Sequence, residues 1–255
     1  MVKTLKITLA ITLLYMVFLV VLFPARFATA TLKEMNAIPP VIKLGSVSGS
    51  IWNGKLSAAS YQGIAVDSIN WQLSPFSILT GTVLVDFKAG KRRSDIRASG
   101  QLAFNSEGLA ANNLSIKAPL TAILQHYPLP YGLTSTGHLD LSIVQFQQDK
   151  PWCESLDGVV KANDLLIKSA FGQLAVDNVS AKLACPNGVL TASMQPSTNS
   201  LGISGNVQLT KTRQYILDAK VQPPSSATQD YINVLKFSGS PNSQNQYVFK
   251  YRGKL

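Results

Sequence analysis

The stretch GVVKANDLLIKSAFGQLAVDNVSAKLACPNGVLTA, residues 158–192, repeats one pattern three times. In each repeat a glycine is followed by apolar residues at the second and fourth positions after it, as in Gly158-Val159-Val160-Lys161-Ala162 and Gly172-Gln173-Leu174-Ala175-Val176. Alternation with a period of two residues is typical of a strand that buries one face and exposes the other. The repeats begin 14 and 16 residues apart, which is the length of one strand and one turn. The stretch therefore predicts an antiparallel meander.

The same pattern occurs across most of the chain, separated by turn-forming residues. Asn105-Ser106-Glu107-Gly108 and Pro186-Asn187-Gly188 tolerate the positive φ angles that hairpin turns need. We therefore predict a mainly β fold, a curved and twisted antiparallel sheet, with short helices over Pro119–Gln125 and Ser225–Lys236 that are too short to be stable alone. The five further repeats begin at Gly54, Gly81, Gly100, Gly137 and Gly205.

An uncharged run of nineteen residues, Ile7–Ala25, precedes the β pattern. As a helix with about 1.5 Å rise per residue it covers roughly 28 Å, close to the hydrocarbon thickness of a bilayer. Lys3 and Lys6 precede the run, which favours a cytoplasmic tail at residues 1–6. The run is therefore interpreted as a single-pass transmembrane anchor, followed by an exported domain at residues 26–255.

A cleaved signal peptide is the alternative interpretation of this region. Ala28-Thr29-Ala30 has the A-x-A form of a signal-peptidase site, with cleavage after Ala30. The apolar run is longer than a usual signal sequence, and Arg26 lies between it and this site. Both features favour an uncleaved anchor.

The exported part contains no Gly/Ser-rich or Pro-rich linker. Polar residues and a proline interrupt the β pattern at Gln147–Pro151. This is the place where we expect a subdivision of the β domain, as two halves of one sheet.

The chain is basic, with a net charge of +10 although only 14% of its residues are charged. Two of the 23 basic residues precede the apolar run, so the exported part keeps 21 basic and 13 acidic residues. Outside the cytoplasm such a surface favours anionic lipids, acidic proteins or envelope polymers over nucleic acid. The densest basic stretch consists of Lys88, Lys91, Arg92, Arg93 and Arg97. It lacks interleaved aromatic residues, and it is interpreted either as a solvated loop between two strands or as a partner contact through Lys91, Arg92 and Arg93.

Two cysteines, Cys153 and Cys185, are both in the exported part. An oxidising compartment makes a disulfide between them the expected state, closing a loop of 32 residues. The two histidines, His126 and His138, do not combine with the cysteines into a zinc-binding spacing, and we expect no metal site.

The sequence offers little for catalysis. Gly45-Ser46-Val47-Ser48-Gly49 resembles a serine-hydrolase elbow, but its central residue is valine. No phosphate-binding glycine loop or cluster of acidic residues is present in the sequence. We therefore expect a protein that is not an enzyme and has no cofactor.

Two tryptophans stand in distinctive surroundings. Trp52 lies between glycines in Gly49-Ser50-Ile51-Trp52-Asn53-Gly54, soon after the apolar run, and Trp71 follows in Asn70-Trp71-Gln72-Leu73. Each is either a packing residue at the edge of a sheet or a contact for a partner protein.

The order and spacing of several short motifs resemble the family of protein N of the bacterial type II secretion system. The resemblance implies an inner-membrane protein whose main part lies in the periplasm, an accessory to the export of folded proteins across the outer membrane. It implies no catalytic residues, and its partners would be inner-membrane platform subunits or the outer-membrane secretin. The motifs are the N-terminal anchor, Gly49-x-x-Trp52-x-Gly54, Trp71-x-Leu73 with Pro75 and Leu79-x-Gly81, Cys153, Gly172 with Leu174, Cys185-x-x-Gly188, Leu201-Gly202-x-Ser204-Gly205 and Gly253-x-Leu255.

A second hypothesis is a lipid-handling protein of the cell envelope. A curved sheet with one apolar face could hold acyl chains against that face. The residues expected on it are Val83, Val85, Phe87, Leu139, Leu141, Ile143, Leu174 and Val176.

Overall fold

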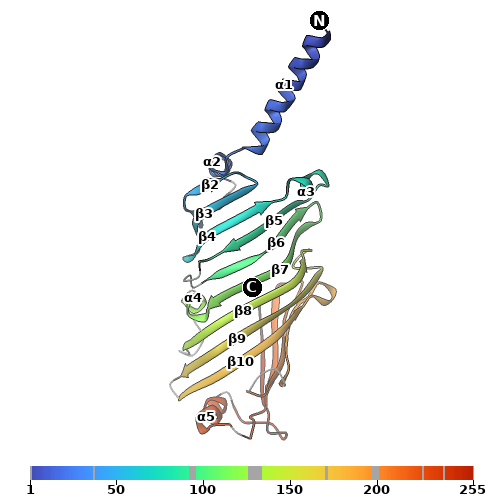
Figure 1. Ribbon diagram of the computed structural model, residues 1–255. Coiled ribbons are helices and arrows are strands. Elements are labelled where there is room, and N and C mark those ends of the chain that lie inside the picture. Colours follow the sequence, from blue (N-terminus) through green and yellow to red (C-terminus); the bar gives the residue numbers. More distant parts are fainter. Residues whose placement is uncertain are drawn as a thin grey trace. The chain divides into compact units, whose positions relative to one another are not determined.

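The computed structural model describes residues 2–36, 38–91, 96–125, 134–169, 172–196, 201–225, 227–237 and 239–254 (Figure 1). The chain forms two compact units, Met1–Ser94 (unit 1) and Asp95–Leu255 (unit 2). Both consist mainly of antiparallel strands, which confirms the predicted fold class. The predicted subdivision at Gln147–Pro151 concerns the turn between two strands of unit 2, β8 (Thr134–Gln147) and β9 (Ser155–Ser169), and it stays a prediction.

Unit 1 combines three helices with an antiparallel sheet within its described residues. Strand β3 pairs with β4 and with the short strands β1 and β2, and β5 pairs with β4. Leu56 of β3 is buried opposite Ile69 of β4, and its neighbours in sequence are exposed. This is the alternation that the sequence predicts. The elements are α1 (Val2–Val21), α2 (Ala25–Glu34), β1 (Ile42–Leu44), β2 (Val47–Gly49), β3 (Asn53–Tyr61), β4 (Ile64–Leu73), α3 (Pro75–Leu79) and β5 (Val83–Ala89).

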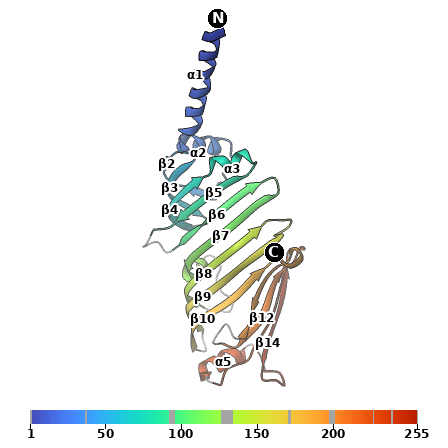
Figure 2. The same cartoon turned by 45° about the vertical axis from the view of Figure 1, so that its right-hand side comes forward.

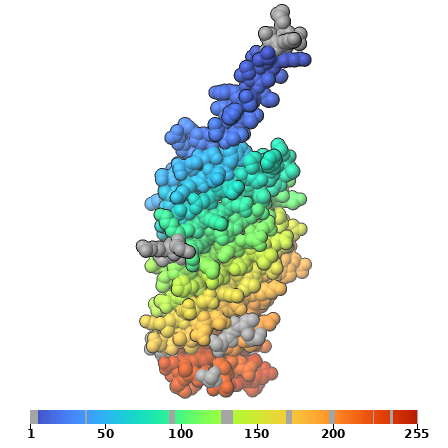
Figure 3. All heavy atoms as spheres, viewed as in Figure 1, coloured from blue at the N-terminus to red at the C-terminus, as the bar shows by residue number. Residues whose placement is uncertain are grey.

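The apolar run at the N-terminal end is not one continuous helix, unlike the single helix expected over Ile7–Ala25. Helix α1 ends at Val21, and α2 begins directly after Pro24. A proline removes a backbone N–H and disfavours helical geometry in the residue before it, so one helix ends and another starts here. From Lys6 onward every side chain of α1 is exposed, and the helix projects from the rest of unit 1 (Figure 3).

No helix in the described part of the chain combines the length and the apolar character that crossing a membrane requires.

Unit 2 is the meander that the sequence predicts. Its nine described strands, β6 to β14, pair antiparallel in the order of the chain, and β12 and β14 run at an angle to β8, β9 and β10 (Figure 2). The short helices expected over Pro119–Gln125 and Ser225–Lys236 are confirmed as α4 and α5. The elements are β6 (Arg97–Asn105), β7 (Gly108–Pro119), α4 (Leu120–Leu124), β8 (Thr134–Gln147), β9 (Ser155–Ser169), β10 (Gly172–Ala184), η2 (Pro186–Gly188), β11 (Leu190–Met194), β12 (Ile203–Leu209), β13 (Gln214–Val221), α5 (Gln229–Phe237) and β14 (Tyr247–Lys254).

A buried apolar cluster lies where α5 packs against the sheet of unit 2. Tyr231 and Leu235 lie four residues apart, on one face of the helix, and are only 5% and 6% exposed. The Tyr231 hydroxyl donates a hydrogen bond to the carbonyl of Leu201. Helix α5 therefore holds the ends of several strands together. The sheet contributes Val176, Val221 and Tyr247 to the cluster, and Leu201 precedes β12.

Burial of Tyr231 predicts a loss of stability at alkaline pH. Desolvation raises the pKa of its hydroxyl to about 12, from 10.0. Because the unfolded chain loses this proton first, stability is complete below pH 10 and falls as the pH rises through the folded pKa, by roughly 2–3 kcal/mol in total. Urea unfolding at pH 9 and pH 11.5 measures the loss. Tyr231→Phe lacks this proton and should lose less, whereas an equal loss in both proteins would contradict the prediction.

Candidate interaction surfaces

The hairpin between β2 and β3 connects the sheet of unit 1 to the end of α1. Gly49, with φ +86°, closes β2, and Ser50 and Asn53 bond to one another across the turn. This turn places the Trp52 indole so that its Nε1–H donates a 2.8 Å hydrogen bond to the Val20 carbonyl. Carbonyls in the last turn of a helix lack the usual partner within the helix. Trp52 therefore caps the C-terminal end of α1.

The second tryptophan packs inside the same sheet. Trp71 of β4 lies opposite Gly54 of β3, and a Cβ on Gly54 would overlap the Trp71 ring. The Trp71 indole donates a 3.0 Å hydrogen bond to the Ile51 carbonyl, and the Ile51 N–H donates to the Phe23 carbonyl. Both tryptophans are partly buried and use their N–H groups within unit 1. Their role as partner contacts stays a prediction.

We expect Trp52→Phe to lower the free energy of unfolding by about 1 kcal/mol, because phenylalanine keeps most of the ring but cannot donate to Val20. Urea unfolding of the full chain in detergent measures the change. Tyr61→Phe, at the exposed far end of β3, is the matched control and should leave stability unchanged. Equal stability of Trp52→Phe and the control would show that this hydrogen bond does not hold α1 to the sheet.

The basic stretch is only partly described. The Lys88 side chain is exposed near the end of β5. Lys91, two residues after the strand, is also exposed. Arg92 and Arg93 lie outside the described residues. A partner contact at this stretch therefore stays a prediction.

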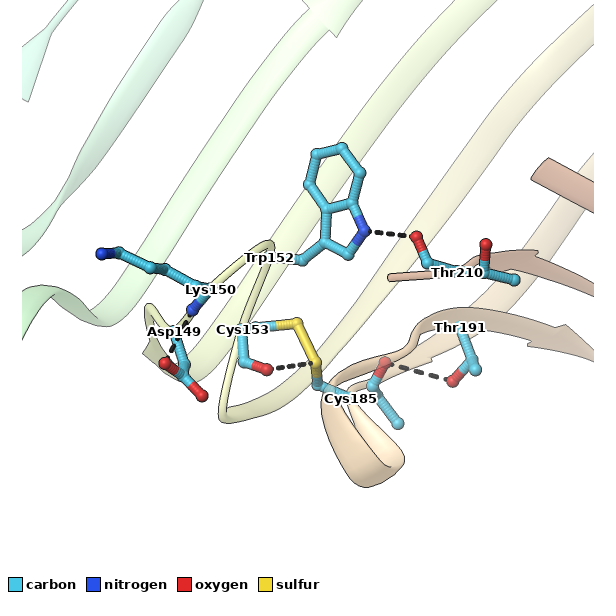
Figure 4. The surroundings of a disulfide bond; sticks show 8 residues. Asp149, Lys150, Trp152, Cys153, Cys185, Thr191 and Thr210 are labelled. Atoms are coloured by element: carbon cyan, nitrogen blue, oxygen red, sulfur yellow. Dashed lines mark hydrogen bonds between the residues drawn. A yellow bond between two sulfur atoms is a disulfide. The ribbon is translucent and has the colours of Figure 1, made fainter. Parts of the chain in front are cut away.

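The predicted disulfide is confirmed, and it joins two turns at one end of the unit 2 sheet (Figure 4). Cys153 lies between β8 and β9, and Cys185 follows β10. Because successive strands of a meander reverse direction, alternate turns lie at the same end of the sheet, which brings the two cysteines together. Both are buried, at 2% and 7% exposure.

Trp152 extends this connection to a third turn. Its indole Nε1–H donates a 2.7 Å hydrogen bond to the carbonyl of Thr210, at the start of the turn between β12 and β13 (Figure 4). Trp152 was not among the residues predicted from the sequence. The one sequence feature that could have indicated its role is its position directly before Cys153, because a residue beside a buried disulfide is often buried as well.

One face of the unit 2 sheet carries rows of apolar residues. Leu141 of β8 lies opposite Ile116 of β7 and Val160 of β9, and all three are partly buried. On the other face, Lys117 and Asp140 form a 3.9 Å ion pair. The flanking rows are Ala118, Leu139 and Ala162, and Leu114, Ile143 and Gly158.

The residues expected on an apolar inner face therefore have different surroundings. Leu174 and Val176 belong to the cluster under α5, where Val176 is 2% exposed. Leu139, Leu141 and Ile143 lie on the apolar rows of β8. The remaining three, Val83, Val85 and Phe87, are in β5 of unit 1.

Within the described residues, no group of three or more His, Cys, Asp or Glu side chains is placed to hold a metal ion. His138 is exposed on β8, opposite Asn163 and Pro119. His126 lies outside the described residues.

Two comparisons relate the chain to proteins of one name. The family model "Type II secretion system (T2SS), protein N" matches residues 40–250. Proteins named "Type II secretion system protein N" are similar over nearly their whole length: that of Aeromonas hydrophila is 26% identical over 243 residues, 94% of each chain. That of Vibrio cholerae is 24% identical over 92% of each chain, and that of Klebsiella pneumoniae is 24% identical over 98% of this chain and 96% of its own.

No solved structure matches the chain significantly. The family match nevertheless covers both units, from before β1 into β14, and therefore includes the Trp52 hairpin, the disulfide and helix α5. The sequence resemblance is thereby confirmed, and the chain belongs to the type II secretion system protein N family.

Proposed function

We propose that this protein is a non-enzymatic, inner-membrane-anchored component of the type II secretion system that supports export of folded proteins from the periplasm across the outer membrane. The observation that carries the proposal is the family match over residues 40–250. In the fold, the exposed apolar helix α1 is hydrogen-bonded to a sheet that can offer an edge and charged faces to partners.

The proposed anchor is the whole apolar run Ile7–Ala25, rather than α1 alone. From Ile7 to Val21 its large apolar side chains are 47–72% exposed, a surface that water does not favour and lipid does. The exposed Lys6 side chain can extend along the helix toward head groups. In this arrangement the run crosses the inner membrane once, residues 1–6 face the cytoplasm and residues 26–255 lie in the periplasm.

The surroundings of α2 support retention of the anchor. The Ala28-Thr29-Ala30 tripeptide lies within α2, which packs against β2 and in which Ala25 is buried. Pro24, directly before the helix, forms a β-bridge with Ser50. Cleavage after Ala30 would therefore divide α2, the helix that contacts β2, into two pieces.

The disulfide and the charge distribution support a periplasmic location and protein partners. Cys153 and Cys185 form a bond typical of an oxidising compartment. At the last strand, β14, Lys250, Arg252 and Lys254 form an exposed basic row on the strand that ends the unit 2 sheet. We propose that such surfaces, together with Lys91, contact inner-membrane platform subunits or the secretin.

Charged substitutions in α1 test the proposal in a strain that carries the gene only on a plasmid. Leu14→Arg with Phe18→Arg should release the protein from membranes during alkaline carbonate extraction and reduce secreted protein in the culture medium, because each arginine costs about 2.5–3.5 kcal/mol at the centre of a membrane helix. Val144→Arg, at an exposed apolar position of β8, is the control and should change neither. Normal secretion by a strain lacking the gene would contradict the proposed function.

The apolar rows of unit 2 favour a second candidate function, lipid handling. Leu139, Leu141 and Ile143 lie in a row along one face, partly exposed and opposite other apolar residues. Native mass spectrometry of the protein released in mild detergent would show copurified phospholipid if this face binds acyl chains. A spectrum without lipid, and unchanged by Leu141→Asp, would exclude this function.

A further inference from the structure

Helix α3 carries the two most exposed large apolar side chains among the described residues. Leu79 is 84% exposed and Phe76 is 80% exposed, and neighbouring Ile78 is 41% exposed. Exposure of this extent is unusual for apolar residues that lie close together. It indicates a surface that is covered by a partner protein or by a membrane.

Several polar groups around α3 are hydrogen-bonded within the turn. Ser77 Oγ donates to the Ser74 carbonyl at 2.8 Å and accepts from the Leu84 N–H at 3.3 Å. The N–H groups of Thr80, Gly81 and Thr82 all donate to carbonyls of Ser77 or Ile78. These internal bonds satisfy part of the backbone of the turn, which lowers the cost of entering a region poor in water. The apolar side chains of α3 therefore extend from a hydrogen-bonded turn.

A chain of hydrogen bonds places α3 at the end of unit 1 from which α1 emerges. The Trp52 indole bonds to Val20 of α1, and the Trp52 carbonyl accepts from the Leu73 N–H at 2.7 Å. Leu73 ends β4, two residues before α3 begins. Both views show α3 on the side of unit 1 where α1 and α2 lie (Figures 1 and 2).

Helix α2 adds an amphipathic surface at the same end. Its Ala25 side is covered, whereas Phe27 and Leu32 are 54% and 44% exposed. Arg26 and Lys33 are also exposed, together with the single acidic residue Glu34. Apolar side chains bordered by basic groups are suited to the boundary between acyl chains and anionic head groups.

We propose that α3 is a second membrane contact, in which Phe76 and Leu79 insert into the head-group boundary of the same bilayer face from which α1 emerges. The inference rests on the proposed anchoring of α1, because α1 brings the end of unit 1 to the membrane. Together the two contacts fix how unit 1 sits on the bilayer, which a single flexible tether cannot do.

Site-specific fluorescence on the full chain tests this contact. The protein is reconstituted into vesicles of phosphatidylethanolamine and phosphatidylglycerol at a 3:1 ratio, with a nitrobenzoxadiazole label on Leu79→Cys, Leu14→Cys or Tyr61→Cys. The two native cysteines are joined to each other, so each variant has one reactive thiol. Tyr61 is the matched control, since it is 52% exposed and lies at the opposite end of β3 from Trp52.

The expected result separates the contact from the anchor. A lipid that carries a nitroxide quencher near its head group should quench the Leu79 label at least about twofold more than the Tyr61 label. This is the expected result if the Leu79 side chain inserts roughly 5–10 Å into the head-group boundary. A lipid that carries the nitroxide deep in its acyl chain should quench the Leu14 label. Quenching at Leu14 with equal values at Leu79 and Tyr61 would overturn the α3 contact and leave the anchor intact, whereas no quenching at Leu14 would overturn both.

A charge substitution checks that the protein, rather than the label, causes insertion. Phe76→Asp in the Leu79-labelled chain should return emission and quenching to the values of the Tyr61 label. Unchanged quenching in this variant would show that the label inserts by itself, and the proposed contact would be wrong.

Discussion

Removing the disulfide is expected to lower the free energy of unfolding by about 3–4 kcal/mol, the value that the chain-entropy model gives for a closed loop of this length. Cys153 and Cys185 are 32 residues apart, and both are buried. The variant is Cys153→Ala with Cys185→Ala, because alanine places no polar group at either site. Thermal unfolding should shift down by roughly 10 °C for a unit of this size.

A reductant provides an independent route to the same state. Wild-type protein in a strong reductant should lose about as much stability as the double variant, and the double variant should not respond to the reductant. Ser193→Ala, at an exposed position of β11, is the control for alanine substitution near this end of the sheet. A loss below about 1 kcal/mol in both experiments would mean that closing the loop does not restrict the unfolded chain as the model assumes.

The disulfide and the meander were predictable because each depends on local or compositional information. Period-two alternation, as at Leu174 and Val176, directly reflects which side of a strand is covered. An exported chain with two cysteines can form only one intramolecular disulfide. Strand order then follows from short turns, since neighbours in sequence become neighbours in a meander.

The helices show where sequence patterns lose information. Counting apolar residues treats Pro24 as part of one run, whereas its missing N–H and ring geometry end α1 at Val21. At α3, the sequence shows Phe76 and Leu79 but not their exposure, because exposure depends on whether another element covers them. The same limit applies to Trp52, whose partner, the Val20 carbonyl, is 32 residues away in the chain.

The residues near the cluster under α5 also illustrate this limit. Leu174 and Val176 were assigned to an open apolar face from alternation alone, but α5 covers this part of the sheet. The helix was predicted over Ser225–Lys236, yet nothing in the local pattern identifies the strands that it packs against. Long-range contacts of this kind decide whether an apolar strand residue is core or binding surface.

Leu235→Ala is expected to lower the free energy of unfolding by about 3–4 kcal/mol, within the range for buried leucine truncations. The Leu235 side chain is 6% exposed and packs in the cluster that includes Val176 and Tyr247. A nine-residue helix is not stable without tertiary contacts, so weakening this packing should also release α5 from the sheet. Urea unfolding measures the first effect, and hydrogen exchange of the α5 amides measures the second.

The matched control is Asn233→Ala on the exposed side of the same helix, which should change stability by less than about 0.5 kcal/mol. If α5 acts as a cover that joins β10 to the start of β14, Leu235→Ala should increase exchange in those strands near Val176 and Tyr247, and leave the disulfide end protected. Uniform faster exchange throughout unit 2 would instead mean that the meander unfolds as one cooperative element, with no separate role for the α5 end. The disulfide constrains the turns at the opposite end of the same strands, so that end can stay folded if α5 stabilises only the strands that it covers. The two outcomes therefore distinguish a helix that stabilises one end of the sheet from a helix on which the whole sheet depends.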